Sequence, residues 1–119
     1  MKDFQNLVVW QKAHQLTLSV YRDTRNFPSD ERFGVTSQLR RSVSSIPANI
    51  AEGCGRGTDA DFARFLQIAM GSASETEYHL RLSRDLSYLN QQQWDPLNQL
   101  TCEVKRMLAA LLKKLKADR

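Results

Sequence analysis

RRSVSSIPANIAEGCGR, residues 40–56, has the apolar spacing of a helix and a proline at its centre. An interior proline has no N–H to donate, and its ring crowds the carbonyl four residues earlier, at a cost of about 3 kcal/mol. Apolar residues nevertheless keep helical phase across Pro47, at steps of four, four, three and four: Val35, Leu39, Val43, Ile46 and Ile50. The segment therefore predicts one helix over about residues 30–52, kinked at Pro47 and ended by Gly53. Two serines are predicted to bond the carbonyls that the proline frees: Ser44 and Ser45.

Three further helices are predicted from similar spacing, over residues 6–24, over residues 59–89, and in a last segment that ends near residue 116. The early part of the helix over residues 59–89 is predicted to have one core face: Phe62, Phe65, Leu66, Ala69, Met70 and Ala73. Its later part carries an apolar stripe: Tyr78, Leu82, Leu86 and Leu89. Four helices with short connections predict an all-α, up-down-up-down four-helix bundle with a proline-kinked second helix. The length of 119 residues predicts a single domain over residues 1–119.

The residues between these segments carry signals for helix starts. Ser29 and Thr58 are predicted to cap the second and third helices, because a side-chain oxygen there accepts from a free N–H of the first turn. Either Asn90 or Asp95 caps the fourth helix, and Pro96 suits the first helical position after Asp95.

Composition excludes several classes of protein. Hydrophobic residues make up 41% and charged residues 25% of the chain, which is typical of a globular domain. No apolar run reaches the roughly 18 residues of a membrane span, and the first residues lack the pattern of a secretory signal. Cys54 and Cys102 are too few for a disulfide framework. We therefore expect a cytoplasmic protein without a membrane partner.

The first helix has two apolar faces. At 100° per residue, one face holds Val9, Ala13, Leu16 and Val20, and an adjacent face holds Leu7, Trp10, Leu18 and Tyr21. A surface helix of a monomer needs only one such stripe. Either this helix is central in the core, or its second face packs on a partner.

Positive charge is concentrated at the end of the chain. Residues 101–119 hold six basic and two acidic residues, and the difference of four equals the net charge of +4. The basic residues are Lys105, Arg106, Lys113, Lys114, Lys116 and Arg119. Two interpretations stay open: a patch that attracts polyanions, or a solvated helix end where cations suit the dipole.

Arg40, Arg41 and Arg56 flank the kinked helix. The kink either aims these arginines at a ligand or only lets a long helix wrap around the bundle. In the second case the arginines form surface ion pairs of little energetic weight. Two interpretations also stay open for Asn49: its side chain bonds neighbouring backbone, or it contacts a ligand.

Residues for catalysis or metal binding are sparse. His14 and His79 lie on different predicted helices, and the two cysteines lack metal-ligand spacing. Arg56 could lower the pKa of the Cys54 thiol; the alternative is a small loop residue without a chemical role. We predict a non-enzymatic protein with no catalytic residues, no cofactor and no metal.

Three segments together resemble the four-helix-bundle family encoded within intervening sequences of bacterial 23S ribosomal RNA genes: NLVVWQKAHQL (6–16), VYRDTRNFPSDERFGVTSQLRRSVSSIPANIAEGCGR (20–56) and FARFLQIAMGSASETEYHL (62–80). The most specific blocks are QLRRSVSSIPANIAEG and FLQIAMGS. Val35 and Ser42 stand where the family usually has leucine and alanine, and neither change threatens the fold. The chain is also similar to the accessory protein of diversity-generating retroelements.

The resemblance implies a homopentameric ring of bundles with a basic surface. In such a ring, the second face of the first helix would form the subunit interface through Leu7, Trp10 and Tyr21. The retroelement relatives bind nucleic acid and a reverse transcriptase, whereas the intervening-sequence members have no assigned activity. Their older label of ribosomal protein does not imply a role in the ribosome.

Two functional hypotheses follow. In the first, an oligomeric accessory module binds RNA or DNA through phosphate contacts that do not read sequence. Its predicted contacts are Arg40, Arg41, Arg56, Lys105, Arg106, Lys113 and Lys114. In the second, the protein is a scaffold or accessory subunit that docks another protein, such as a reverse transcriptase.

Overall fold

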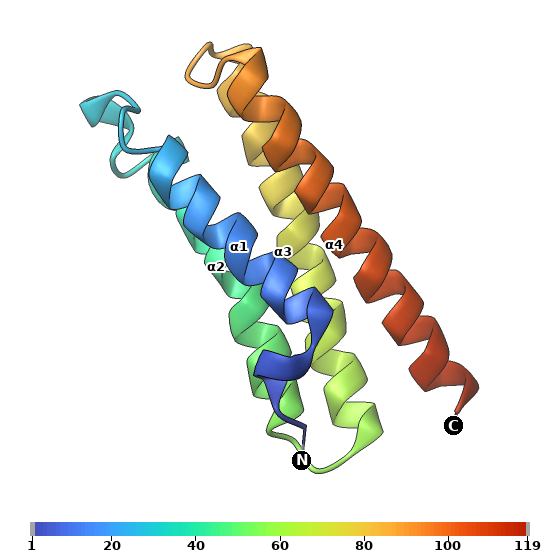
Figure 1. Ribbon diagram of the computed structural model, residues 1–119. Helices are drawn as coiled ribbons and strands as arrows, with labels where there is room; N and C mark the ends of the chain where they lie inside the picture. Colours follow the sequence, from blue (N-terminus) through green and yellow to red (C-terminus); the bar gives the residue numbers. More distant parts are fainter. Residues whose placement is uncertain (1, 119) are drawn as a thin grey trace.

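The computed structural model describes residues 2–118, and all regular secondary structure in that range is helical (Figure 1). The elements are η1 (Phe4–Asn6), α1 (Val8–Asp23), η2 (Ser29–Glu31), α2 (Val35–Cys54), α3 (Asp59–Asp85) and α4 (Gln91–Ala117). The predicted all-α class and the four long helices are confirmed. The short 3-10 helices η1 and η2 were not predicted.

Each long helix packs against two others (Figure 1). α2 contacts α1 and α3, and α4 contacts α3 and α1. Within residues 2–118, α1 does not contact α3, and α2 does not contact α4. The chain ends and the α2–α3 connection lie at one end of the molecule, and the other two connections lie at the opposite end (Figure 1). Residues on the outer sides of α1 and α3 therefore face different directions, as do those of α2 and α4.

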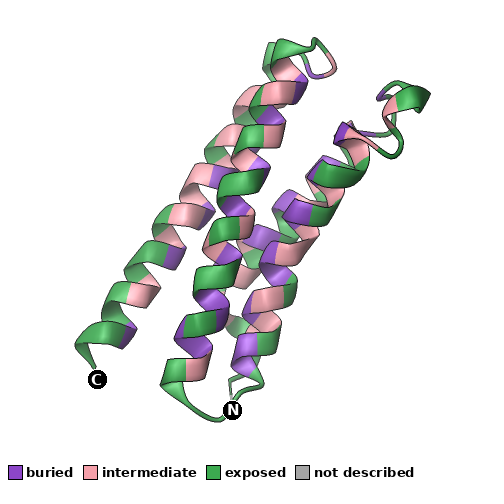
Figure 2. Cartoon of the chain, turned by 180° about the vertical axis from the view of Figure 1, so that it is seen from behind, coloured by how far each residue is buried: buried purple, intermediate pink, exposed green. Residues whose placement is uncertain are grey.

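Buried residues line the inner sides of the helices (Figure 2). The predicted core of α1 and α2 is confirmed, since all of its members are buried: Val9, Ala13, Leu16, Val20, Val35, Leu39, Val43, Ile46 and Ile50. Burying these side chains removes apolar surface from water, which is the main favourable term in folding.

After Ala73, the core face of α3 does not follow the second predicted stripe. Tyr78 and Leu86 are exposed, and the buried positions are Thr76, Leu80 and Ser83. Those three keep the steps of three and four residues that hold one helical face. The hydroxyls of Thr76 and Ser83 are compatible with burial because each donates to a carbonyl of α3 four residues earlier, at 2.8 Å for Thr76 and 2.7 Å for Ser83.

α2 begins at Val35, so the predicted cap at Ser29 is wrong. Residues Ser29–Glu31 form the separate helix η2, and Gly34 precedes α2 with a non-helical φ of −108° and ψ of −120°. Glu31 supplies the cap instead, because its Oε1 accepts from the Val35 N–H at 3.2 Å. Its Oε2 accepts from the Tyr88 hydroxyl at 2.8 Å. A carboxylate suits this place because a helix N-terminus carries partial positive charge.

The acid sensitivity of the fold should depend on Tyr88. Its hydroxyl first, and then the Val35 N–H, hold the pKa of Glu31 below its ordinary value of 4.5. With the folded pKa lowered, the stabilisation is complete above pH 4.5 and is lost as the pH falls through the folded pKa. Tyr88→Phe is therefore expected to make the melting temperature fall less steeply between about pH 5 and about pH 3. Thermal melts followed by circular dichroism across that range measure the slope, and an unchanged slope would contradict the assignment.

Pro47 lies inside one continuous helix, as predicted. It cannot donate to the carbonyl of Val43, four residues earlier. The Thr17 hydroxyl of α1 lies 3.2 Å from that carbonyl and shares its single proton between it and the Ala13 carbonyl at 2.8 Å. The prediction for Ser44 and Ser45 is wrong, because Ser44 bonds earlier carbonyls of its own helix and Ser45 pairs with a serine of α3. The proline is thus coupled to the α1–α2 contact.

Gly53 was predicted to end α2, but the helix continues through Cys54 and is capped by Gly55. Gly53 is buried, and a Cβ added to it would lie 2.9 Å from the Cβ of Phe65 in α3. Real Cβ atoms do not approach so closely. The glycine is therefore required for the close approach of two helices and not for a stop.

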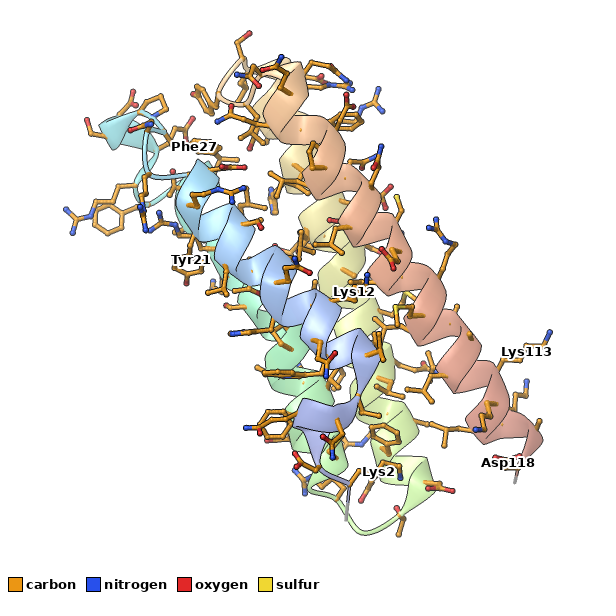
Figure 3. All side chains as sticks on the ribbon, in the orientation of Figure 1. Lys2, Lys12, Tyr21, Phe27, Lys113 and Asp118 are labelled. Carbon is orange, nitrogen blue, oxygen red and sulfur yellow. The ribbon has the colours of Figure 1, made fainter. Side chains whose placement is uncertain are left out.

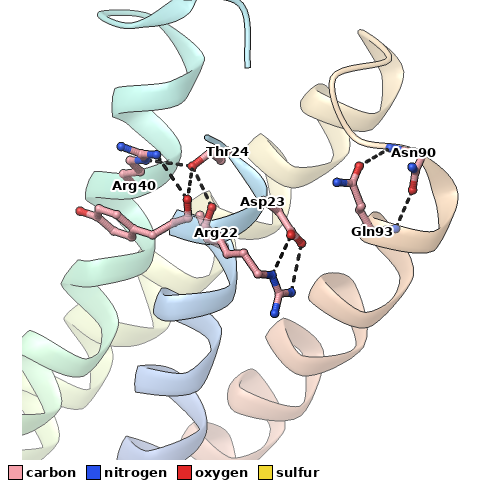
Figure 4. Close-up of polar contacts among 8 residues, drawn as sticks. Arg22, Asp23, Thr24, Arg40, Asn90 and Gln93 are labelled. Atoms are coloured by element: carbon pink, nitrogen blue, oxygen red, sulfur yellow. Dashed lines mark hydrogen bonds and ion pairs between the residues drawn. The ribbon is translucent and has the colours of Figure 1, made fainter. Parts of the chain in front are cut away.

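The remaining helix ends follow local signals with two exceptions. Thr58 caps α3 as predicted, accepting from an N–H of the first turn at 3.1 Å. α3 ends at Asp85 and not near residue 89, because Ser87 adopts a left-handed φ of 64°. Asn90 is the cap of α4, in a reciprocal capping box (Figure 4). Pro96 lies inside α4, so its predicted first position is wrong.

Candidate nucleic-acid interface

The C-terminal half of α4 carries exposed cations that we call the α4 cation face: Arg106, Lys113, Lys114 and Lys116. Among the described residues, the ion pairs of α4 involve only Lys105 and Glu103, so these four cations have no acidic partner there. Lys113 extends from the outer side of α4 (Figure 3). Residues 104–117 include no acidic side chain, and the exposed Ala109 and Ala110 lie between the cations. The face spans about 15 Å of helix.

Lys105 was predicted to belong to this surface, but it serves the contact between α3 and α4. It is half-buried, and its Nζ donates to the Glu77 carboxylate of α3 at 2.8 Å. A second pair joins Lys12 of α1 to Glu103 of α4 at 3.1 Å. Partly exposed pairs of this kind contribute at most about 1 kcal/mol each. The pair with Glu77 directs the Lys105 ammonium toward α3.

The Arg40 side chain is hydrogen-bonded to the C-terminal end of α1 (Figure 4). Its Nε donates to the Thr24 hydroxyl at 2.9 Å, and its Nη2 donates to the Tyr21 carbonyl at 3.4 Å. The guanidinium also lies 4.7 Å from the centroid of the Tyr21 ring. A cation here offsets the partial negative charge of the last carbonyls of α1. Arg40 therefore holds α1 to α2.

Arg41 is exposed at the edge of a hollow between α2 and α3, which Ser45 and Glu75 also line. The Glu75 carboxylate makes this hollow a poor place for a phosphate, because like charges repel. Asn49 donates to the Ser45 carbonyl at 2.8 Å and to the Ser45 hydroxyl at 2.9 Å. These bonds agree with the local backbone reading of Asn49.

Arg56 lies in the α2–α3 connection, at the same end of the molecule as the end of α4 (Figure 1). Its guanidinium is 3.6 Å from Glu52 and 4.9 Å from the centroid of the Phe65 ring. The pair with Glu52 is partly exposed, so solvent screens it.

The seven predicted contact residues do not form one surface. Arg40 and Arg41 lie on α2, which does not contact α4. Arg106, Lys113 and Lys114 are brought together, and they are joined by Lys116, which the prediction omitted. The excess of basic residues after residue 100 was the signal that could have included it.

The three predicted interface residues are also divided. Trp10 and Tyr21 share the outer side of α1, and Figure 3 shows Tyr21 pointing away from α4. Trp10 is half-buried and stacks on His14, with ring centroids 4.9 Å apart. Leu7 precedes α1 in extended backbone and lines a groove with Met107 of α4. Leu7 therefore belongs to the α1–α4 side of the molecule.

The histidines and cysteines considered for catalysis or metal binding lie in separate local environments. In residues 2–118, no three His, Cys, Asp or Glu side chains are grouped to hold a metal ion. Burial raises the pKa of the Cys54 thiol, so activation by Arg56 is not supported. The Nε2 of His79 lies 3.4 Å from Glu75 on the same helix. None of the helices described is long and apolar enough to cross a membrane.

Comparisons with known proteins agree with this helical architecture. A sequence model of the 23S rRNA-intervening sequence protein family matches residues 5–110. The chain is similar to a crystal structure from Bacteroides thetaiotaomicron, described as a protein with unknown function from the S23 ribosomal protein family. The TM-score is 0.80 at 31% identity, over 89% of this chain and 99% of that chain. No curated protein matches. The chain belongs to the 23S rRNA-intervening sequence protein family.

Proposed function

We propose that this protein is a non-enzymatic, oligomeric module that binds nucleic acid without sequence preference. The observation that carries the proposal is the α4 cation face, whose four exposed cations have no acidic neighbour over residues 104–117. Lysine and arginine contacts to phosphates give affinity by releasing counterions and carry no sequence information. Repetition of the face in several subunits would turn weak contacts into useful binding.

The oligomer of this proposal is a pentameric ring, as the family resemblance implies. Support comes from large apolar side chains left exposed on α1, on α3 and directly after α3: Leu18, Tyr21, Ile68, Tyr78 and Leu86. Gathered apolar surface on a soluble chain marks interaction sites.

The subunit of this ring is an up-down-up-down bundle whose α2 bends at Pro47. The short connections, residues 55–58 and 86–90, favour antiparallel neighbours. The missing N–H and the ring of an interior proline favour the bend.

Reversing two charges of the α4 cation face should abolish most binding. Lys113→Glu with Lys116→Glu changes the net charge by −4, since each substitution contributes −2. We expect at least a roughly tenfold loss of affinity for single-stranded RNA at about 50 mM salt. The neutral pair, Lys113→Gln with Lys116→Gln, should lower the slope of log affinity against log salt by about two. Fluorescence anisotropy with a labelled RNA and a labelled duplex DNA, between about 50 and 200 mM salt, measures both quantities.

The matched control is Arg25→Glu with Arg32→Glu, which also changes the net charge by −4. Both arginines are exposed in the α1–α2 connection, at the opposite end of the molecule (Figure 1). This variant should bind within about threefold of the parent protein, because distant exposed charges are screened by salt. Equal losses in the two variants, or binding that does not change with salt, would overturn the proposal.

A second candidate function is docking of a partner protein, and Phe33 favours it. This side chain is 86% exposed at the α1–α2 connection. A reverse transcriptase is the partner that the resemblance to retroelement accessory proteins implies. Native mass spectrometry of protein purified with and without nuclease separates the two functions. Extra mass that nuclease removes is nucleic acid, extra mass that survives is a protein, and the same spectra give the number of subunits.

A further inference from the structure

The outer side of α3 carries a line of exposed residues. Its members follow steps of three, four and three: Ile68, Gly71, Glu75 and Tyr78. These steps keep side chains on one face of a helix. Tyr78 is 61% exposed and Ile68 is 43% exposed. We call this line the α3 outer stripe.

Gly71 is the unusual member of the α3 outer stripe. Glycine is the least favourable residue after proline inside a helix, and Gly71 lies near the middle of α3. No heavy atom of the chain's packing lies within 4 Å of the position of its Cβ. This differs from Gly53, where α3 itself fills that space. Packing within one chain therefore does not explain Gly71, whereas close approach of another helix would, because glycine permits it.

α1 carries a second line along its outer side, which we call the α1 outer stripe: Trp10, His14, Leu18 and Tyr21, at steps of four, four and three. Trp10 also packs against the core and Tyr21 lies against the Arg40 guanidinium, so Leu18 is the most exposed apolar member. Leu18 is 59% exposed, and His14 is exposed and stacked on Trp10. α1 does not contact α3 within the described chain. The two stripes therefore face different directions and cannot cover each other in one subunit.

We propose that the α1 outer stripe of one subunit packs against the α3 outer stripe of a second copy of this chain. The shapes are complementary, because the missing side chain at Gly71 leaves space on α3 for the large side chains of α1. The polar members are complementary too, because an imidazole N–H of His14 can donate to the exposed carboxylate of Glu75. A contact of the α3 stripe with itself, centred on Glu75, would instead oppose two carboxylates.

Such a contact is heterologous, since it joins two different surfaces of the same chain. Each subunit then offers one stripe to each neighbour, and repetition gives a closed ring or a filament. The inference rests on the proposed ring and adds the two surfaces that build it. It also leaves the α4 cation face outside the contact, because that face lies on a different helix.

Gly71→Trp is the direct test. We expect self-association to weaken about 30-fold or more, as loss of a well-packed interface centre does. Helix content should be unchanged, because the side chain enters open space in the single subunit. Ala109→Trp is the matched control, on the exposed side of α4, and should assemble like the parent protein. Sedimentation velocity gives the association, and circular dichroism confirms the fold of each variant.

Disulfide formation gives a second readout that does not depend on a destabilising substitution. In a Cys102→Ser background, Leu18→Cys combined with Tyr78→Cys should yield a ladder of linked chains under oxidation, whereas each single cysteine should yield none. A monomeric parent protein at micromolar concentration would end the proposed ring and this contact together. An oligomeric parent that Gly71→Trp leaves intact would overturn this contact alone. Linked dimers from one single-cysteine variant would do the same, because they indicate a symmetric contact.

Discussion

Replacing Gly53 with leucine is expected to lower the free energy of unfolding by about 3 kcal/mol or more. A Cβ at this position would lie 2.9 Å from the Cβ of Phe65 and 3.0 Å from Cδ1 of Phe62. Neither neighbour can move cheaply, because one atom is fixed to the α3 backbone and the other belongs to a buried ring. The better helix propensity of leucine recovers only about 1 kcal/mol. Since small domains are stable by about 5–15 kcal/mol, urea unfolding followed by circular dichroism should detect a large shift of the midpoint.

Gly57→Leu is the control for this experiment, because it introduces the same side chain four residues later, in the α2–α3 connection. No atom lies within 4 Å of a Cβ placed on Gly57. Its stability should therefore change by less than about 0.5 kcal/mol. If Gly53→Leu and Gly57→Leu unfolded at the same urea concentration, the close packing of α2 on α3 at Gly53 would be wrong.

Gly53 also illustrates what sequence patterns can and cannot decide. The spacing of apolar residues predicted the four long helices and the core of α1 and α2, because that signal depends only on helical geometry. Thr58 was predictable as a cap because capping also depends only on neighbouring residues: its side chain accepts from an N–H of the first turn. A glycine near a helix end, by contrast, is equally suited to a stop and to a close helix contact. Only the position of α3 distinguishes the two.

The start of α2 was mispredicted because its cap is a tertiary feature. Glu31 accepts from the Val35 N–H, and Tyr88, 57 residues later, holds the same carboxylate. A local pattern cannot include so distant a partner. Ser29 therefore appeared to be the better cap, although it begins a separate short helix.

The same limit applies to the candidate site. Lys105 and Lys113 are the same residue type on the same helix, yet Glu77 of α3 binds the first and leaves the second free for solvent. The register of α3 against α4 makes that difference, and composition does not contain it. The stripe that includes Tyr78 was likewise not placed by the sequence, because an apolar stripe has the same spacing whether its partner is the same chain or another one.

Thr17→Val is expected to lower the free energy of unfolding by about 1–3 kcal/mol. The substitution keeps the shape of the side chain and removes the hydroxyl that reaches the Val43 carbonyl at 3.2 Å. Pro47 cannot donate to that carbonyl, so the acceptor is left buried without its interhelical donor. The other contact of the hydroxyl, to the Ala13 carbonyl of its own helix at 2.8 Å, is less costly to lose. Urea unfolding of the single variant measures the total.

A double-mutant cycle with Pro47→Ala isolates the part of that cost that the proline causes. Alanine restores an N–H at position 47, which can donate to the Val43 carbonyl, so Thr17→Val should cost about 1 kcal/mol less in this background. Ser44→Ala is the matched control, because the Ser44 hydroxyl only supplements carbonyls of its own helix and should show no coupling to Pro47→Ala. Additive effects of Thr17→Val and Pro47→Ala would mean that α1 does not compensate for the proline. The tolerance of α2 for an interior proline would then have to come from its apolar packing alone, since Pro47 is buried among neighbouring helices.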